Sequence, residues 1–370
     1  MAPTELLAEQ HWRNFNPWLL PLGIEVAWLS GKLSAKNRRS MLELIASGRA
    51  PVAVGTHALF QEEVQFAKLG LVIVDEQHRF GVHQRLLLRE KGRHNGAVPH
   101  QLIMTATPIP RTLAQAFYAD LDVSVIDELP PGRKPVDTVV VPDTRRAEVV
   151  ARVHAACREG RQAYWVCPLI EESDQLQAEA ATETAAVLTA ALPELKVALV
   201  HGRLKPAEKE AVMRDFKDGK TQLLVATTVI EVGVDVPNAS LMIIENAERL
   251  GLSQLHQLRG RVGRGAAQSS CVLLYHAPLS ENARERLSIL RDTHDGFEIA
   301  RRDLDMRGPG EVLGTRQTGE QAFHIADLVR DQKLLPHIER AATLLMEKYP
   351  DRVTPLIRRW LEMREHYGEV

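Results

Sequence analysis

The feature that most constrains the fold is a short apolar run that ends in two carboxylates. Residues Leu71 to Val74 are all apolar and suit a buried strand, and Asp75 and Glu76 follow them directly. In sheets of parallel strands, ligands bind at the carboxyl ends of the strands. An Asp at such an end can bind Mg²⁺ while the next Glu orients a water molecule. The run therefore indicates phosphoryl transfer, and a strand that simply ends in a polar turn is the alternative.

The length and charge of the chain limit the kinds of protein it can be. Its 370 residues suit two domains and a smaller appendage. The 46 Lys and Arg residues nearly balance the 48 Asp and Glu residues, so any surface for nucleic acid must be local. The three cysteines are far apart and fit reduced core thiols. The sequence shows neither a membrane-spanning run nor a leader, so we expect a cytoplasmic protein without membrane contact.

Two series of alternating strands and helices predict two α/β domains with parallel sheets. In the first series, β-rich runs occupy 52–54, 71–74, 102–104 and 123–126. In the second, strands are expected at 163–166, 197–200, 223–226, 241–244 and 271–274, with helices over 145–159, 179–192 and 206–219. A stiff segment from Pro130 to Pro135 separates them, and helices follow Pro278, including 331–349 and 354–367. We therefore predict domains over 1–132, 133–277 and 278–370.

A pair of arginines forms the second candidate site. Arg261 and Arg264 are three residues apart, so on a helix they would share one face and reach one phosphate chain together. Arginines at the transferring phosphoryl group accelerate nucleotide hydrolysis by roughly 10³ to 10⁵. The alternative is a solvated basic helix. The glycines beside the arginines argue against it, because glycine weakens helices.

Hydroxyl and carboxylate side chains also follow two further apolar strands. Thr105 and Thr107 come after the run at 102–104, and a segment from Thr227 to Asp235, which includes Gly233, follows 223–226. Taken singly, each of these segments is more simply explained as a strand-to-helix turn.

Taken together, these segments resemble the core of superfamily 2 helicases over residues 1 to about 277. The order and spacing of six segments carry the resemblance: Pro3 to Gln10, Gly55 to His57, Asp75 to His78, Thr105 to Thr107, Thr227 to Asp235, and Gln257 to Arg264. The resemblance implies two RecA-like domains, the first truncated at its N-terminus, with ATP in the cleft between them. It also implies Mg²⁺ on Asp75 and Glu76 as the residue that orients water.

The same resemblance implies roles for the remaining residues. Arg261 and Arg264 would act as arginine fingers. The residues that couple the nucleotide to nucleic acid would be His78, Thr105, Thr107, Gly233, Asp235 and Gln257. The DNA backbone would contact Thr4, Gly55 and Thr56. Thr4 is also placed to cap a helix that begins at Glu5.

The C-terminal third narrows the family. Residues Asp295 to Gly319 resemble the translocation motif shared by RecG and the transcription-repair coupling factor. The ending Gly-Thr-Arg-Gln-Thr-Gly and the helical tail are closer to the RecG family of branch-migrating DNA helicases. The resemblance implies a helical segment that moves the protein along duplex DNA through Arg301, Arg302, Arg307 and Gln317. A surface charge cluster is the alternative for these arginines.

Membership of the RecG family would imply branched or duplex DNA as the partner, in DNA repair and recombination. It would also imply a monomer, with single-stranded DNA-binding protein as a candidate partner.

The phosphate-binding loop of such motors is missing from the sequence. No Gly-x-x-x-x-Gly-Lys-Ser/Thr occurs in the chain. In the RecG family this loop lies upstream of the position where the chain starts, together with a wedge domain for branched DNA. Without the loop, little would hold the β- and γ-phosphates. We therefore expect a C-terminal fragment of an ATP-driven motor that is inactive alone. Two alternatives stay open: a non-catalytic DNA-binding remnant and a transcription-repair coupling translocase.

Overall fold

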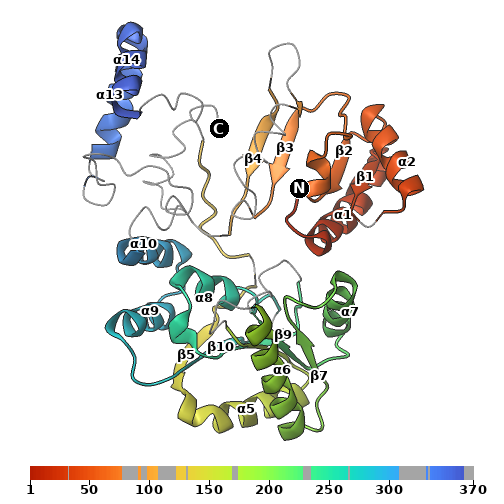
Figure 1. The fold of residues 1–370 in the computed structure, drawn as a ribbon, viewed down its shortest axis with the longest axis vertical. Coiled ribbons are helices and arrows are strands. Elements are labelled where there is room, and N and C mark those ends of the chain that lie inside the picture. The colour runs from red at the N-terminus through yellow and green to blue at the C-terminus, as the bar shows by residue number, and fades with distance from the viewer. Residues whose placement is uncertain are drawn as a thin grey trace. The chain divides into compact units, whose positions relative to one another are not determined.

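The computed structural model describes residues 1–31, 33–76, 91–92, 98–106, 122–130, 132–168, 174–227, 235–265, 267–307, 331 and 334–361. The chain divides into two compact units (Figure 1). The first comprises Met1–Ala106 and the second comprises most of the remainder.

The first unit contains two small parallel sheets that the first two residues connect. β1 (Val26–Leu29) pairs with β2 (Val52–Gly55), and β3 (Leu71–Val74) pairs with β4 (His100–Ile103). The Met1 amine donates to the carbonyl of Ile73 at 2.8 Å, and the Asp75 amide donates to the carbonyl of Met1 at 3.0 Å. The Ala2 amide donates to the carbonyl of Gly55 at 3.1 Å. The carboxyl ends of β2 and β3 are therefore held beside the start of the first helix.

Two helices accompany the β1–β2 sheet. α1 (Glu5–Leu19) contacts both strands, and α2 (Ala35–Ala46) packs on β1. The hydroxyl oxygen of Thr4 accepts a hydrogen bond from the Leu7 amide at 3.4 Å, which is the N-cap that the sequence predicts. Ser34 caps α2 in the same way through the Asn37 amide at 3.3 Å.

The second unit is built on one sheet of six parallel strands, in the order β5-β10-β9-β6-β8-β7. The strands are β5 (Asp137–Pro142), β6 (Gln162–Val166), β7 (Val197–Val200), β8 (Leu223–Ala226), β9 (Ala239–Ile244) and β10 (Ser270–Tyr275). Each neighbouring pair is parallel, which confirms the predicted second sheet. Three connecting helices are α5 (Arg146–Arg158), α6 (Asp174–Ala191) and α7 (Pro206–Lys217).

The core of the second unit lies on both faces of β6. Successive strand residues point to opposite faces. Trp165 therefore packs in the core that α5 and α6 cover, whereas Tyr164 lies 4.9 Å from Phe216 of α7, measured between ring centroids. Both β6 side chains are almost fully buried.

The chain continues as helices after the sheet, as the sequence predicts. These are α9 (Glu281–Asp292), α10 (Gly296–Arg307), α13 (Leu335–Lys348) and α14 (Pro350–Leu361), while α8 (Leu252–Arg259) precedes the last strand. None of the described helices is long and apolar enough to cross a membrane. All three cysteines are free and buried, which confirms them as core thiols.

Some sequence predictions about strands are wrong or incomplete. The strand predicted at 123–126 is absent, because residues 122–127 form neither helix nor strand. Ile126 there is 89% exposed, so the burial that would stabilise a strand is missing. The sequence pattern also does not indicate β1 or β5. β5 follows directly after the proline-rich segment and itself ends in Pro142, which obscures its apolar run.

A buried arginine fastens α8 to the end of α9. The guanidinium of Arg259 donates from Nη1 to the carbonyls of Leu290 at 2.7 Å and Thr293 at 2.9 Å. Its Nη2 donates to Nδ1 of His256 at 3.2 Å. Burial, and then the charge of Arg259, lower the pKa of His256 to about 4. The ring is therefore neutral at pH 7 and can accept this hydrogen bond.

Gly55 is a packing position as well as a predicted DNA contact. A Cβ at Gly55 would lie 2.3 Å from the carbonyl oxygen of Leu29 in the paired strand. We expect Gly55→Ala to lower the free energy of unfolding of the first unit by about 1–3 kcal/mol, because backbone must move to admit the methyl group. Urea unfolding measures this. Gly70→Ala is the control, since a Cβ there meets nothing within 4 Å. Equal stability of both variants would show that β1 and β2 can separate freely.

His256 makes the stability of the second unit depend on pH. Its folded pKa of about 4 lies below the usual 6.5, so protonation favours the unfolded chain between these values. The contribution of His256 to the free energy of unfolding should be fully present above about pH 6.5. It should fall as the pH drops toward 4, by roughly 3 kcal/mol at most. His256→Gln should flatten this dependence in urea unfolding across pH 4–7, whereas His294→Gln, at an exposed position, should not. A slope unchanged by His256→Gln would assign the pH dependence to other groups.

Candidate active site

The two carboxylates of the first unit lie where β3 ends. Asp75 Oδ2 is 2.9 Å from His11 Nε2 on α1. This hydrogen bond lowers the pKa of Asp75, against the opposing effect of burial, so the carboxylate is ionised at neutral pH. Sequence reasoning missed His11, although it follows Gln10 at the end of a matched segment.

Glu76 adopts a backbone conformation that residues with side chains seldom take. Its φ is 53°, in the left-handed region. Such strained residues concentrate at functional sites, where the surrounding structure holds them in place. The strain therefore supports a functional reading of the predicted pair.

Thr56, one of the residues predicted to contact the DNA backbone, belongs to a hydrogen-bond network inside the first unit. Glu5 Oε1 accepts hydrogen bonds from the Gly31 amide at 3.0 Å and from the Thr56 hydroxyl at 3.2 Å. Thr56 is 1% exposed. Glu5 therefore joins the start of α1 to the segments that follow β1 and β2. Contact of Thr4, Gly55 and Thr56 with DNA stays a prediction.

Arg261 and Arg264 lie in a loop, so the prediction that they share a helical face is wrong. α8 ends at Arg259, and Gly263 has a φ of 79° that no regular helix contains. A Cβ at Gly263 would lie 2.8 Å from Cγ2 of Val136, and one at Gly265 would lie 2.3 Å from the carbonyl oxygen of Pro237. These close approaches hold the arginine loop on both sides.

The loop brings both arginines near the carboxylate of Asp235. Arg264 Nη1 is 3.7 Å from Asp235 Oδ1, and Arg261 is 9% exposed. Tyr164 lies beside them: burial raises its pKa, and the charges of Arg261 and Arg264 oppose that shift. Arg261, Arg264 and Asp235 are therefore neighbours, and the contacts of Gly263 with Val136 and of Gly265 with Pro237 place the loop beside the segments that lead into β5 and β9.

The remaining predicted residues are less closely grouped. Gln257 lies on α8 and is partly exposed, and Thr105 follows β4 and is exposed. His78, Thr107, Gly233 and Gln317 lie outside the described residues.

The arginines of the predicted translocation segment lie on α10. Arg301 and Arg302 are exposed, and Arg302 Nη2 is 3.8 Å from Glu298 Oε1. Arg307 is the last residue of α10, and its side chain lies outside the described part of the chain. Ser253 of α8 donates to Asp303 Oδ2 at 2.5 Å, and Asp303 is 3% exposed. This contact anchors α10 to the helix that leads into the arginine loop.

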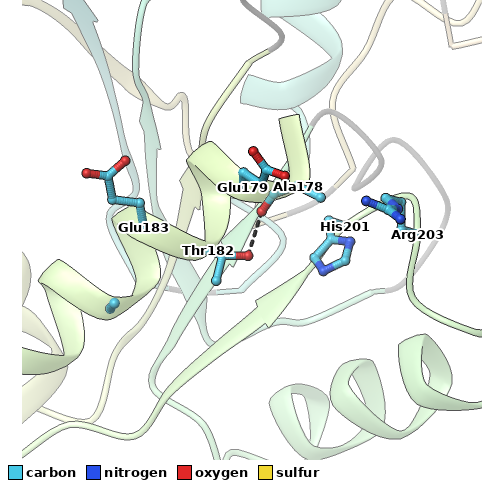
Figure 2. Close-up of a pocket in the computed structure, with 7 residues that line it drawn as sticks. Ala178, Glu179, Thr182, Glu183, His201 and Arg203 are labelled. Carbon is cyan, nitrogen blue, oxygen red and sulfur yellow. Dashed lines mark hydrogen bonds between the residues drawn. The ribbon is translucent and has the colours of Figure 1, made fainter. Parts of the chain in front are cut away.

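A separate pocket of about 620 Å³ lies between α6 and the residues after β7 (Figure 2). It is lined by Ala178, Glu179, Thr182, Glu183, Ala186, His201 and Arg203. Burial, followed by the charges of Lys209 and Arg203, lowers the pKa of His201. None of the residues predicted from the sequence lines this pocket, and its mixed charge suits neither a polyanion nor a cation.

Three protein families match successive parts of the chain. Residues 1–116 match the DEAD/DEAH box helicases, and residues 146–266 match the helicase conserved C-terminal domain. Residues 293–365 match domain 3, C-terminal, of the ATP-dependent DNA helicase RecG.

Curated relatives match the chain from end to end. The ATP-dependent DNA helicase RecG of Escherichia coli (strain K12) is 67% identical over 369 residues, which cover 100% of this chain and 53% of the relative. That of Synechocystis sp. is 50% identical and covers 97% of this chain and 44% of the relative. The chain spans about half the length of the curated relatives it matches.

A solved structure of RecG gives the same assignment, and a more distant one shares the fold. RecG bound to a three-way DNA junction is 46% identical with a TM-score of 0.72, covering 90% of this chain and 43% of that chain. S. cerevisiae Dbp5 bound to RNA and ADP BeF3 is 15% identical with a TM-score of 0.56, covering 83% of this chain and 80% of that one, and shares the fold alone. The arrangement of two RecA-like parallel-sheet units followed by a helical segment is therefore confirmed. By its sequence over its whole length and by its fold, the chain belongs to the RecG family of helicases.

Proposed function

We propose that this chain is the motor part of an ATP-dependent DNA helicase that acts on branched DNA. The observation that carries the proposal is the pair Asp75 and Glu76 at the end of β3, in a chain 67% identical to a RecG helicase. A relative solved on a three-way DNA junction supports branched DNA as the substrate. This function implies a role in DNA repair and recombination in the cytoplasm. We also propose that the protein is a monomer and that single-stranded DNA-binding protein is one of its partners.

The carboxylate of Asp75 fits a role in holding Mg²⁺. Mg²⁺ prefers oxygen ligands and is commonly held by one or two carboxylates together with substrate phosphates. Asp75 is ionised and its side chain is 24% exposed. Among the described residues no three His, Cys, Asp or Glu side chains cluster as a metal site. Bound Mg²⁺ would neutralise charge on the phosphates, and Glu76 would orient the attacking water.

The arginines of the second unit can supply the positive charge that stabilises a transferring phosphoryl group. Arg261 and Arg264 are held by the close packing at Gly263 and Gly265 rather than by a flexible helix end. Preorganised cations lower the barrier to phosphoryl transfer because they need not rearrange when charge develops. We propose that Arg264 stabilises the transferring phosphoryl group, and that Gln257 and Asp235 relay the nucleotide state.

The printed chain lacks a Gly-Lys-Thr type phosphate loop, so we expect it to hydrolyse no ATP by itself. The match of residues 293–365 to RecG favours RecG over a transcription-repair coupling translocase. A non-catalytic remnant is disfavoured because the carboxylate pair and the arginine loop are both present.

Replacement of Arg264 tests the chemical step. In a protein that joins this chain to the phosphate loop of a RecG relative, Arg264→Ala should lower kcat for ATP by roughly 10³-fold, because the developing charge loses its cation. DNA affinity, measured by fluorescence anisotropy, should change little. Arg145→Ala is the control, since Arg145 is exposed and pairs only with Glu148 in the described contacts. Equal loss of kcat and DNA affinity would indicate a folding defect and count against the assigned role.

Replacement of Arg302 tests translocation separately from hydrolysis. In the same joined protein, Arg302→Ala should abolish unwinding of a three-way junction while DNA-stimulated ATP hydrolysis stays measurable. The reason is that Arg302 is exposed on α10, away from the arginine loop in sequence. A gel assay of strand release and a phosphate-release assay give the two readouts. Arg291→Ala on α9 is the control. Normal unwinding by Arg302→Ala would remove the residue from the translocation machinery.

A further inference from the structure

A third arginine lies beside the arginine loop, in the segment before β5 that the sequence analysis treats as a linker. Arg133 is partly buried, yet its guanidinium makes no hydrogen bond or ion pair with another described residue. Buried charges are normally paired, because removal from water without a partner is costly. A partly buried guanidinium that has no ion-pair partner among the described residues is therefore available to bind an external anion.

Backbone packing places Arg133 next to the loop. A turn joins the Arg133 amide to the carbonyl of Pro130 at 3.1 Å, and Val136 is 8% exposed. The chain of Gly263 passes so close that a Cβ there would lie 2.8 Å from Val136 Cγ2 and 3.8 Å from the carbonyl oxygen of Lys134. The linker and the arginine loop are therefore packed directly against each other, and Gly263 is required at the contact.

The charges around Arg133 do not balance. Burial lowers the pKa of Arg133, the charge of Arg264 lowers it further, and Asp235 opposes both effects. The charge of Asp235 therefore acts on both guanidinium groups, although only Arg264 is in contact with it among the described residues. Asp235 Oδ1 is buried and makes no hydrogen bond within the described residues, and it lies 3.7 Å from Arg264 Nη1. That separation is too long for a strong ion pair, so Asp235 holds Arg264 only loosely.

We propose that Arg133 is a further anion-binding residue of this cluster, that it shares Asp235 with Arg264 and thereby positions Arg264, and that its ligand is a polyphosphate chain of the kind a nucleoside triphosphate carries. The inference rests on the proposed function and extends it to a linker residue. When the polyphosphate binds, Arg264 exchanges its long contact with Asp235 for phosphate oxygens, and Arg133 gains an anionic partner. The segment before β5 in the second unit thereby becomes part of the phosphate-binding cluster.

The test measures binding of inorganic tripolyphosphate to the purified chain by isothermal titration calorimetry. Arg133→Gln should weaken binding by about tenfold or more, as expected for loss of charge-assisted hydrogen bonds. Arg133→Lys should restore much of the affinity, because it keeps the charge. Lys134→Gln is the matched control: it removes an adjacent exposed charge from the same linker and should leave affinity unchanged. Asp235→Asn should tighten binding severalfold, because it removes the competing carboxylate.

Three outcomes would overturn the inference. Wild-type affinity in Arg133→Gln, with affinity lost in Arg264→Gln, would exclude Arg133 and leave the role of Arg264 standing. If Arg133→Gln and Lys134→Gln weakened tripolyphosphate binding equally, the binding would be explained by non-specific attraction to positive charge. Absence of tripolyphosphate binding by the unsubstituted chain would exclude the anion site. The proposed function fails on different evidence, namely the ATP hydrolysis and unwinding measurements of the joined protein. Thermal unfolding of each variant separates a loss of ligand from a loss of fold.

Discussion

The parallel hydrogen bonding of the strands is the constraint on which the rest of the structure depends. Because neighbouring strands run in the same direction, the residues that follow them emerge at one edge of the sheet. The pairing of β6 with β9 also brings Tyr164, which lies within β6, into the neighbourhood of Asp235, which precedes β9, although their positions differ by 71 (235 minus 164). In the first unit Thr56 follows β2 and Asp75 follows β3, and the hydrogen bonds of Met1 and Ala2 connect the ends of these two strands, which belong to separate sheets. The backbone hydrogen bonding of the strands therefore brings these functional residues close together, independently of contacts between their side chains.

Close backbone packing provides the second level of order. The arginine loop owes its shape to two approaches that admit no Cβ, at Gly263 against Val136 and at Gly265 against Pro237. α8 is then fixed to α9 by Arg259 and to α10 by Asp303. The loop is consequently held by neighbours on every described side, which suits a cation that must be in place before charge develops.

Much of the fold could be predicted from the sequence because its strands are short apolar runs with clear ends. Five strands of the six-stranded sheet and α1 with its Thr4 cap follow from such local signals, whereas β5 does not. The arginine loop could not be predicted, since the spacing of Arg261 and Arg264 suits a helix and only the distant Val136 and Pro237 exclude it. The contact of His11 with Asp75 and the position of Arg133 likewise depend on residues far apart in sequence. Local patterns predict elements, whereas the pairing of charges requires the packed chain.

The left-handed backbone of Glu76 has a consequence for how such a chain can vary. A non-glycine residue in this conformation costs on the order of 1–3 kcal/mol, which Glu76→Gly would recover. Selection for stability alone would therefore favour glycine at this position and lose the carboxylate. Glu76 therefore keeps a carboxylate at this position at a cost in stability, and substitutions meant to stabilise this chain should leave it untouched.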